Sequence, residues 1–476
     1  MITFLVITPF LGSVFALIMN PAQSRSFSVA LSSAIFVTSL SLWVFFDTLD
    51  TRYQFTDALP GLGSLGVPLQ FGVDGLSLFF ILLTTLITPI CLAMSPMSKQ
   101  PPLFYCAFLF MEALLIGAFS ALDLVSFYVF FEGVLIPMFI LIGVWGSRSR
   151  RIRAAYYLFY YTLVGSILML LGILYMYSEL GATSVHILHA HEFTLTEQLI
   201  LWPLLFVALA VKVPVVPAHV WLPEAHVEAP TAGSVVLAGI LLKLGGYGML
   251  RYIIPVLPEA TEYYTPLVLT IASVSVIYSS LTTLRQVDLK KIIAYSSVAH
   301  MNLGLLGLFS LNTQGVEGSL FLMIGHGVVS STLFLLVGVL YDRHGTRLLR
   351  YYGGLTQVMP AFSALFLFFS LANMGLPGTS NFVGEILVFL GLIARSPVSA
   401  VISAWGMVLG AGYSLWLFNR ICLGTLKIKH LSSFADLTQF ELYIITFMCV
   451  LSIILGVYPS PALDILHAPT LYTLRV

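Results

Sequence analysis

Long apolar stretches, separated by short polar segments, dominate this chain. A bilayer core about 30 Å thick requires about 20 largely apolar residues per helix. Hydrophobic residues form 59% of the 476 residues and charged residues only 9%, whereas soluble domains are about 45–50% apolar and about 25% charged. So few charges cannot cover a water-soluble surface of this size. The sequence therefore predicts an all-α polytopic membrane protein with about 14 transmembrane helices.

The predicted helices group into four segments. Residues 1–96 form an N-terminal three-helix segment, 103–253 and 266–422 form two five-helix segments, and 436–476 hold a C-terminal helix and tail. The first stretch has neither a basic leader nor a small-residue cleavage site, which indicates a retained helix rather than a secretory signal. The apolar stretches have the approximate boundaries 1–20, 27–47, 75–96, 103–121, 123–145, 155–177, 198–218, 231–253, 266–284, 292–311, 317–341, 361–395, 399–422 and 440–460.

Lysine and arginine are distributed unevenly between the predicted loops. Loops on the cytoplasmic or matrix side of a membrane carry the excess of these residues. Of the 21, 15 fall in odd-numbered loops and 4 in even-numbered loops and the tail, while Lys212 and Lys243 lie within predicted helices. An error in the helix count would have mixed the two sets. The distribution therefore predicts that both termini face outward and that the odd-numbered loops face the cytoplasm or matrix.

The loops are too short to hold a catalytic domain. The balance of 21 basic and 21 acidic residues gives no electrostatic footprint for nucleic acid. Residues 61–66, Gly-Leu-Gly-Ser-Leu-Gly, formally match a dinucleotide fingerprint, but neither a strand before them nor a helix after them is predicted. The four cysteines lie in apolar stretches without metal-ligand spacing. Any redox cofactor is therefore expected on other chains.

Seven ionisable residues stand out within the predicted helices. An ionised side chain at the centre of a helix costs about 2.5–3.5 kcal/mol on insertion scales, and such residues usually face a protein interior or a water-filled path. They indicate a route for protons or ions. A lone buried histidine can instead be a packed, hydrogen-bonded residue, and one of the glutamates, at 112, can be the structural partner of a nearby cation. The seven are Glu112, Glu132, Lys212, Lys243, His300, His326 and Glu385.

Two of these residues lie where a helix is expected to break. Pro214 and Pro217 follow Lys212, and proline removes a backbone donor and clashes with the preceding turn. Glu385 follows a Gly-Leu-Pro-Gly-Thr turn at 375–379, in a stretch too long for one straight helix. Interrupted helices at matching positions in two halves are typical of inverted-repeat transporters. The sequence thus predicts two inverted five-helix repeats, each containing a broken helix.

Several motifs resemble those of the antiporter-like subunits of respiratory complex I, NADH:ubiquinone oxidoreductase. They cover most of residues 70–425. Within that family, Glu385 stands where two sister subunits usually carry lysine, which singles out one branch, and residues 341–355 resemble mitochondrially encoded members. The motifs are FEGVLIPM at 131–138, GVWG at 143–146, VKVPVVPAHVWLPEAHVEAP at 211–230, DLKKIIAYSSVAHMN at 288–302 and GE at 384–385.

The resemblance implies a proton relay that begins in the first repeat. Glu132 would pair with Lys212 and modulate its proton affinity. This is physically reasonable, because burial drives a lysine toward neutrality and a nearby carboxylate drives it back toward charge. A movement of Glu132 would therefore switch the protonation of Lys212. Lys243 would be the central relay residue that receives the change.

The resemblance places the rest of the relay in and beside the second repeat. His300 and His326 would bridge the two lobes through water. Glu385 would load or release the proton in the second lobe. Glu112 and His219 would take further parts that the resemblance defines less well. Coupled titration of such groups could turn an electrostatic or conformational push from partner subunits into proton transport.

The resemblance also implies an assembly. FMN, iron–sulfur clusters and ubiquinone are expected on partner subunits and none of them on this chain. Sister antiporter-like subunits would flank the chain in the mitochondrial inner membrane or, for a prokaryotic source, in the bacterial plasma membrane. The cluster of Arg148, Arg150, Arg151 and Arg153 either holds an anionic lipid head group or only anchors the topology.

Two other functions remain open at this point. A subunit of a multi-protein sodium/proton antiporter, or of a membrane-bound hydrogenase, would use the same fold and many of the same motifs. A structural spacer of the membrane arm would keep the assembly together without moving protons. The partners that copurify distinguish the first alternative, and replacement of Lys212 or Glu132 distinguishes the second.

Overall fold

The computed structural model describes residues 1–62, 67–95, 101–427 and 435–475. The elements are almost all helices. In chain order they are α1 (Ile2–Ile18), α2 (Pro21–Val44), β1 (Gln54–Leu62), β2 (Val67–Val73), α3 (Gly75–Met94), α4 (Pro102–Ser120), α5 (Leu124–Gly133), α6 (Leu135–Trp145), α7 (Arg151–Leu180), α8 (Val185–Ala190), α9 (Leu195–Lys212), α10 (Trp221–Glu228), α11 (Thr231–Val236), η1 (Leu237–Leu241), α12 (Leu242–Gly248), η2 (Met249–Ile253), α13 (Pro258–Leu284), α14 (Leu289–Leu308), α15 (Thr313–His344), η3 (Leu349–Tyr351), η4 (Leu355–Gln357), α16 (Pro360–Asn373), α17 (Ser380–Arg395), α18 (Pro397–Cys422), α19 (Gln439–Val457) and α20 (Ser460–Arg475).

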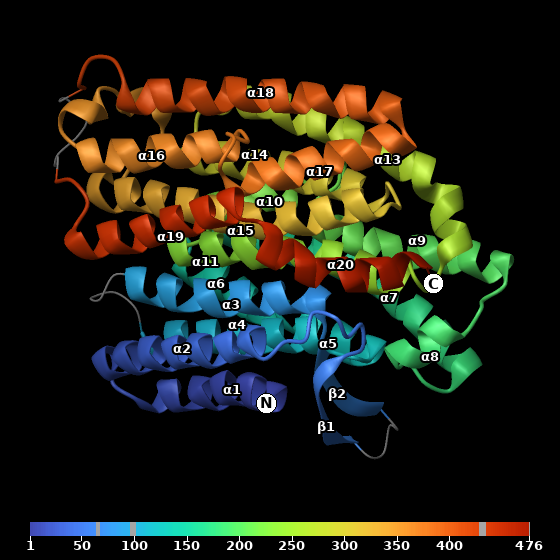
Figure 1. Ribbon diagram of the computed structural model, residues 1–476. Coiled ribbons are helices and arrows are strands. Elements are labelled where there is room, and N and C mark those ends of the chain that lie inside the picture. The colour runs from blue at the N-terminus through green and yellow to red at the C-terminus, as the bar shows by residue number, and fades with distance from the viewer. Residues whose placement is uncertain (63–66, 96–100, 428–434, 476) are drawn as a thin grey trace.

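The long helices run side by side in one bundle (Figure 1). Every predicted apolar stretch is largely helical, although the one at 231–253 consists of short consecutive segments. Within the described residues, 11 helices are long and apolar enough to cross a membrane when consecutive segments are joined. The prediction of an all-α polytopic membrane protein is confirmed, whereas the count of 14 and the inverted repeats stay predictions. Both chain ends lie at the end of the bundle that carries β1 and β2 (Figure 1). Following the predicted orientation, we call this the outer end and the opposite one the inner end.

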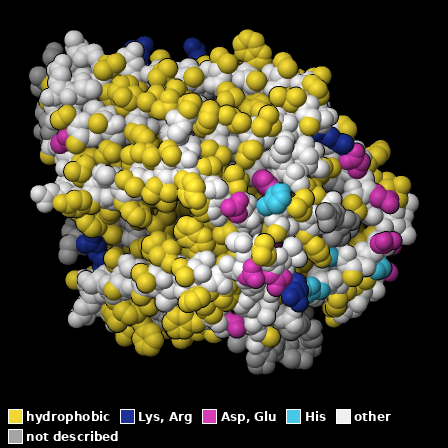
Figure 2. All heavy atoms as spheres, viewed as in Figure 1, with side chains coloured by type: hydrophobic (Ala, Val, Ile, Leu, Met, Phe, Trp, Pro, Cys, Tyr) yellow, Lys and Arg dark blue, Asp and Glu magenta, His cyan; other side chains and the backbone are white. Residues whose placement is uncertain are grey.

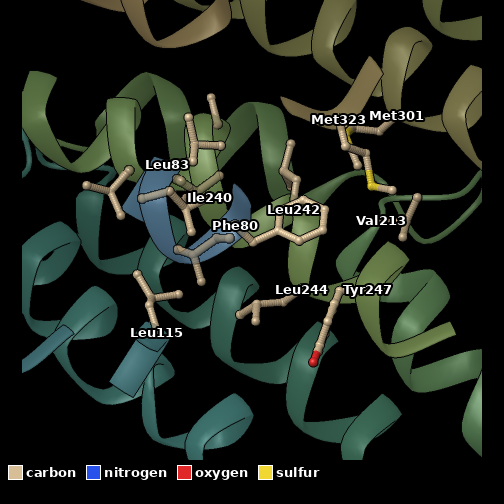
Figure 3. Packing of buried hydrophobic residues seen from close by; sticks show 14 of the residues in the cluster. Phe80, Leu83, Leu115, Val213, Ile240, Leu242, Leu244, Tyr247, Met301 and Met323 are labelled. Atoms are coloured by element: carbon tan, nitrogen blue, oxygen red, sulfur yellow. The ribbon is translucent and has the colours of Figure 1, made fainter. Parts of the chain in front are cut away.

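The bundle is apolar both inside and on much of its surface. The buried core is continuous, and Figure 3 shows Phe80, Ile240 and Leu242 within it. The outside carries many exposed large apolar side chains, such as Phe15 and Trp405, and Figure 2 shows hydrophobic side chains spread across one face. Water does not tolerate an apolar surface of this extent, but hydrocarbon does. The surface therefore fits a lipid environment.

A β-hairpin at the outer end is the one addition to the all-helical prediction among the described residues. β1 and β2 pair antiparallel, and Asp57 on β1 accepts a 2.6 Å hydrogen bond from the N-terminal ammonium. Residues 63–66 of the glycine-rich stretch lie outside the described residues. The strand before this stretch was not predicted, but a second strand follows it instead of a helix. The context of a dinucleotide fold is therefore still incomplete.

Both predicted helix breaks are confirmed. α9 ends at Lys212 and α10 begins only at Trp221, because Pro214 and Pro217 cannot continue the helical hydrogen bonds. α16 ends at Asn373 and α17 begins at Ser380, across a turn in which Gly375 and Gly378 adopt positive φ. Backbone that leaves a helix at membrane depth has to be buried in protein or line a cavity. Most residues of the two breaks are buried or half-buried in this chain, whereas Pro217 and Pro377 are exposed.

The predicted helix at 231–253 is irregular. Two π-helical segments, η1 and η2, flank α12. π-bulges are frequent at functional sites because they alter the direction of neighbouring side chains. Lys243 is the second residue after η1, and its ammonium donates to the carbonyl oxygen of Ala238, five residues earlier, at 2.5 Å. The π turn thus supplies the first partner of this buried lysine.

Three cations assigned to loops from the sequence are buried instead. Lys290 is the second residue of α14 and is 2% exposed, and Arg347 is fully buried. Arg251 lies in η2 and forms two 2.7 Å hydrogen bonds with the carboxylate of Asp74. The count of basic residues by loop treated them as solvated. Their burial follows from partners that are distant in the sequence, which no local pattern reveals.

Candidate functional site

Four of the predicted site residues form a continuous buried row across the centre of the bundle. The Lys243 ammonium on α12 lies 2.9 Å from Nδ1 of His326 on α15. The rings of His326 and His300, on α14, have centroids 5.5 Å apart. Nδ1 of His300 lies 3.3 Å from a carboxylate oxygen of Glu385 on α17. The row thus runs from Lys243 through His326 and His300 to Glu385, whereas the resemblance gave no order for the two histidines.

The side chains of this row are closed off from solvent. Lys243 is fully buried, and the other three are between 1% and 8% exposed. Nε2 of both histidines and one carboxylate oxygen of Glu385 are buried without a hydrogen-bond partner among the described residues. Leaving a buried polar atom unpartnered costs about 1–3 kcal/mol. Because these unpartnered atoms lower the stability of the folded state, the cluster indicates function rather than packing.

Two glycines allow the row to form. Gly239 in η1 and Gly327 in α15 lie where their helices approach closely: a Cβ atom at Gly327 would lie 2.6 Å from Cδ2 of Leu83 and 3.0 Å from the carbonyl oxygen of Gly239. Contacts below 3.0 Å are repulsive, so a side chain at this position would push the helices apart. The close approach brings Lys243 within hydrogen-bond distance of His326, the residue before Gly327.

Replacing Gly327 with alanine is therefore expected to destabilise the protein by about 1–3 kcal/mol through overpacking and to slow transport by separating Lys243 from His326. The matched control is Gly412→Ala in α18, where a Cβ atom meets nothing within 4 Å. Thermal unfolding of the purified assembly measures the difference. Equal midpoints for the two variants would contradict this explanation of the glycine.

The predicted pair in the first repeat is present but not in direct contact. Lys212, the last residue of α9, is 2% exposed, and its ammonium lies 4.5 Å from the ring centroid of Phe131. Glu132 follows Phe131 on α5 and is half-buried, and the charges of Glu132 and Lys212 act on each other. Within the part of the chain that the structure describes, no ion pair shorter than 4.0 Å joins the two residues. The resemblance implied that Glu132 and Lys212 form a pair, and in the structure the two side chains are separated.

Glu112 and His219 lie apart from the row. Glu112 is fully buried on α4, where Thr88 donates a 2.8 Å hydrogen bond to one carboxylate oxygen. Glu112 was also considered as the structural partner of a nearby cation, but it forms no ion pair among the described residues. His219 lies in the break between α9 and α10, and its ring is 5.4 Å from that of Tyr278 and 6.1 Å from that of Tyr295. Neither residue has a contact that joins it to the row.

Sequence reasoning missed one buried histidine. His226 on α10 is fully buried, and both ring nitrogens lack a hydrogen-bond partner among the described residues. Its ring stacks on Phe334 of α15 at 4.6 Å. The residue was part of a quoted motif, but it was not predicted within a membrane helix and was therefore passed over. A scan for histidines in broken-helix segments would have found it.

Comparison with known proteins gives the family. The family described as NADH:quinone oxidoreductase/Mrp antiporter, TM, matches residues 121–411. NADH-ubiquinone oxidoreductase chain 4 of Arabidopsis thaliana is 53% identical over 468 residues, which cover 97% of this chain and 94% of that protein. A chain of respiratory complex I from Thermus thermophilus with bound NADH is 31% identical with a TM-score of 0.92, and covers 100% of this chain and 99% of that one.

A structure of the Mrp complex from Dietzia gives a more distant match. One of its chains has a TM-score of 0.85 at 19% identity, and the match covers 98% of this chain and 52% of that one. At this identity the likeness concerns the fold alone. The bundle and its buried row thus define the class as an antiporter-like, multi-pass membrane subunit.

Within this class the chain belongs to the NADH-ubiquinone oxidoreductase chain 4 family, as a subunit of complex I. Glu385, in place of the lysine usual in two sister subunits, agrees with this branch.

Proposed function

We propose that this chain is a proton-translocating subunit of the membrane arm of complex I, and that the row from Lys243 to Glu385 carries the protons. The observation that supports the proposal is the continuity of the row: four ionisable side chains from α12, α15, α14 and α17 lie in sequence at short distances in an otherwise apolar core. Such intramembrane groups usually mark proton relays.

The hydrogen-bond partners of the row determine which nitrogen of each histidine is a donor and which is an acceptor. A charged Lys243 can only donate, so Nδ1 of His326 is the acceptor and its neutral ring carries the proton on Nε2. Toward a charged Glu385, His300 donates from Nδ1, which leaves its Nε2 as an acceptor. The two unpartnered Nε2 atoms are therefore a donor and an acceptor. The ring centroids lie 5.5 Å apart, and water-mediated hydrogen bonds can join polar groups that do not touch directly.

Transfer along the row conserves protons at each step. Lys243 gives a proton to Nδ1 of His326, and the resulting imidazolium releases the other proton from Nε2. Nε2 of His300 takes it up, and Nδ1 of His300 passes its own proton to Glu385. Each histidine ends in the opposite tautomer, so ring rotation or return transfer has to reset it before the next proton.

We further propose that Glu132 controls Lys212, as the resemblance implies. The two residues form no ion pair in the described part of the chain, and Phe131, the neighbour of Glu132, faces the Lys212 ammonium at 4.5 Å. Because a nearby carboxylate stabilises a buried ammonium, an approach of Glu132 would hold the proton on Lys212 and a retreat would release it. Glu112 and His219 have no contact with the row, so any part they take would require water or movement.

The driving energy is proposed to come from partner subunits. Moving one charge across the membrane requires about 2.3 kcal/mol per 100 mV. In the proposal, redox reactions on other subunits supply this free energy. FMN, iron–sulfur clusters and ubiquinone are assigned to partner subunits, and sister antiporter-like subunits to the neighbouring positions. The proposed location is the mitochondrial inner membrane, in keeping with the plant relative at 53% identity.

The arginine cluster at 148–153 is the proposed contact for an anionic lipid head group. Arg151 donates to the Gly146 carbonyl oxygen at 3.2 Å, and Arg153 donates to the Tyr157 hydroxyl at 2.8 Å. Arg148 and Arg150 are exposed. Two of the four guanidinium groups therefore hold the protein's own atoms, and a head group would rest mainly on the other two.

Replacing Lys212 with alanine tests transport against the role of a spacer. We expect normal assembly, because the ammonium only faces the Phe131 ring and a distant carboxylate, together with a loss of about tenfold or more in proton translocation coupled to NADH oxidation. Proton uptake into reconstituted vesicles measures the effect. Unchanged pumping in this variant and in the Glu132→Ala variant would favour a spacer.

The transporter alternative is tested by the partners. The match to an Mrp chain and the name of the family keep a sodium/proton antiporter assembly as the second candidate. Copurification with flavin and iron–sulfur subunits and with quinone reductase activity is expected for a membrane-arm subunit of complex I. A partner set without redox centres would favour the second candidate.

A further inference from the structure

A buried ion pair lies between the row and the outer end of the bundle. Arg251 belongs to the helical run at 231–253 that also carries Lys243, and it follows that lysine by eight residues, or about 12 Å along a helix. Its partner Asp74 directly follows β2, and Tyr53 directly precedes β1. Both therefore flank the hairpin at the outer end. The ion pair is almost fully buried, since the two side chains are only 4% and 7% exposed.

The Arg251 guanidinium uses all of its hydrogen-bond donors. A guanidinium has five N–H groups. Two donate to the Asp74 carboxylate at 2.7 Å each, two to the Tyr247 hydroxyl at 3.2 and 3.3 Å, and one to the Tyr53 hydroxyl at 3.0 Å. The guanidinium carbon also lies 5.2 and 5.3 Å from the centroids of the two tyrosine rings. Every N–H thus has a protein partner, and none is left to hold a water molecule.

The Tyr247 hydroxyl, on the side of Arg251 that faces the row in sequence, is equally committed. It donates its proton to the carbonyl oxygen of Phe119 at 2.8 Å and accepts two hydrogen bonds from Arg251. A hydroxyl has one proton and two lone pairs, so this group has no capacity left for a relay. The row is different, because Nε2 of His326 and Nε2 of His300 lack partners among the described residues.

The charges of the pair also oppose the passage of a proton. A proton arriving from the outer side would have to bind the Asp74 carboxylate, which would leave the Arg251 guanidinium buried without its counter-ion. Removing one partner of a buried ion pair is strongly unfavourable. A fixed arginine in a narrow passage excludes protons and other cations by its charge, and arginine itself does not release a proton.

We propose that Asp74, Arg251 and Tyr247 form an outer seal, which closes the first five-helix segment to protons from the outer side. The proposal rests on the function proposed above, because a protein that moves protons cannot leave its buried groups open to both sides of the membrane at once. Without the outer seal, outer protons would reach Lys243 and return to the inner side. The pair thus has a function in coupling beyond its contribution to stability.

The Arg251→Met, Asp74→Asn double variant tests the outer seal in the assembled complex. It removes both charges together, so no buried charge is left unpaired. In reconstituted vesicles without NADH, we expect an imposed pH gradient to decay about tenfold faster or more, which corresponds to a barrier lower by about 1.4 kcal/mol or more. NADH oxidation is expected to continue while fewer protons are pumped per NADH. A merely structural pair would reduce the amount of assembled complex without making the assembled complex leak.

Arg52→Met is the matched control for the double variant. Arg52 pairs with Asp50 at the same end of the bundle, but it is 87% exposed. Its replacement is expected to leave the vesicles as tight as those with the unmodified complex. A double variant as tight as this control would overturn the outer seal.

Adding Lys243→Met to the double variant shows whether the leak passes through the row. Methionine carries no proton, so the triple variant is expected to be tight again. A leak that persists in the triple variant would be a general packing defect and would also overturn the outer seal. Lys243→Met alone separates the two proposals. If it stops pumping while the double variant stays tight, the proposed function stands without the seal. If it pumps normally, the proposed function fails as well.

Arg251→Lys covers the case in which the double variant does not assemble. Lysine keeps a cation beside Asp74, but an ammonium has three donors instead of five, so at least two of the five hydrogen bonds are lost and water can enter. We expect the pH gradient to decay about threefold faster or more than in the Arg52→Met control, and Lys243→Met to abolish the difference. Decay at the rate of the control would overturn the outer seal.

Discussion

Replacing Lys243 with methionine is expected to lower proton translocation coupled to NADH oxidation about a hundredfold or more, with little loss of assembly. Methionine fills similar volume and removes the ammonium that lies 2.9 Å from Nδ1 of His326. The fully buried position favours an apolar side chain, so the folded state does not depend on the ammonium. Proton uptake into vesicles per NADH oxidised measures the loss.

Two further variants separate charge from proton exchange at this position. Lys243→Arg keeps a cation but does not release its proton, and it is expected to fail as methionine does. Leu244→Met is a conservative change of the next residue in the same core and is expected to pump normally. Normal pumping by Lys243→Arg would show that the row requires only a fixed positive charge and would exclude the transfer mechanism.

Replacing Arg251 with methionine is expected to destabilise the protein by about 3–5 kcal/mol, because it leaves Asp74 as an unpaired buried carboxylate. The two side chains are 4% and 7% exposed and are joined by two hydrogen bonds of 2.7 Å. His189 on α8 adds a 3.2 Å hydrogen bond from Nε2 to the Arg251 carbonyl oxygen. Burial lowers the pKa of His189 to about 4, so its ring is neutral and offers the carboxylate no replacement charge.

A second change is expected to restore much of the loss. Asp74 is the N-cap of α3, where its side chain accepts a hydrogen bond from the backbone N–H of Ser77. Asparagine can keep that cap without a charge. The Arg251→Met, Asp74→Asn double variant should therefore be more stable than Arg251→Met alone. Arg52→Met is the control, since Arg52 is 87% exposed beside Asp50 and such pairs contribute about 0–1 kcal/mol. Equal thermal midpoints for Arg251→Met and Arg52→Met would contradict the account.

The elements predicted correctly are those with local causes. Proline at 214 and 217 ends α9 whatever surrounds it, and glycine at 375 and 378 allows the turn before α17. Apolar stretches of about 20 residues form helices in lipid because backbone groups must pair within the segment. For the same reason Lys243 and Glu385 could be singled out from sequence, since a charge within such a stretch needs a cause.

The errors concern contacts between distant segments. Lys290 and Arg347 were counted as loop residues because their neighbours are polar. Both are buried, and Lys290 donates to the carbonyl oxygen of Ala229 and Arg347 to that of Val227. The hairpin of β1 and β2 depends on pairing between two segments rather than on a strong strand pattern. The residue whose side chain faces the Lys212 ammonium is Phe131 rather than Glu132, its neighbour on α5. No periodicity within one segment encodes such distances.

The amino-acid order alone was enough to establish a polytopic membrane bundle, its two broken helices and the identities of the ionisable residues inside it, because each follows from the cost of placing polar groups in hydrocarbon. Packing established which of these residues meet. Lys243 reaches His326 because Gly239 and Gly327 let two helices approach, and the His226 ring of α10 stacks on Phe334 of α15. Such proximity is a property of the assembled bundle. Lys243 and His326, for example, are 83 residues apart along the chain, so only tertiary contacts bring them together.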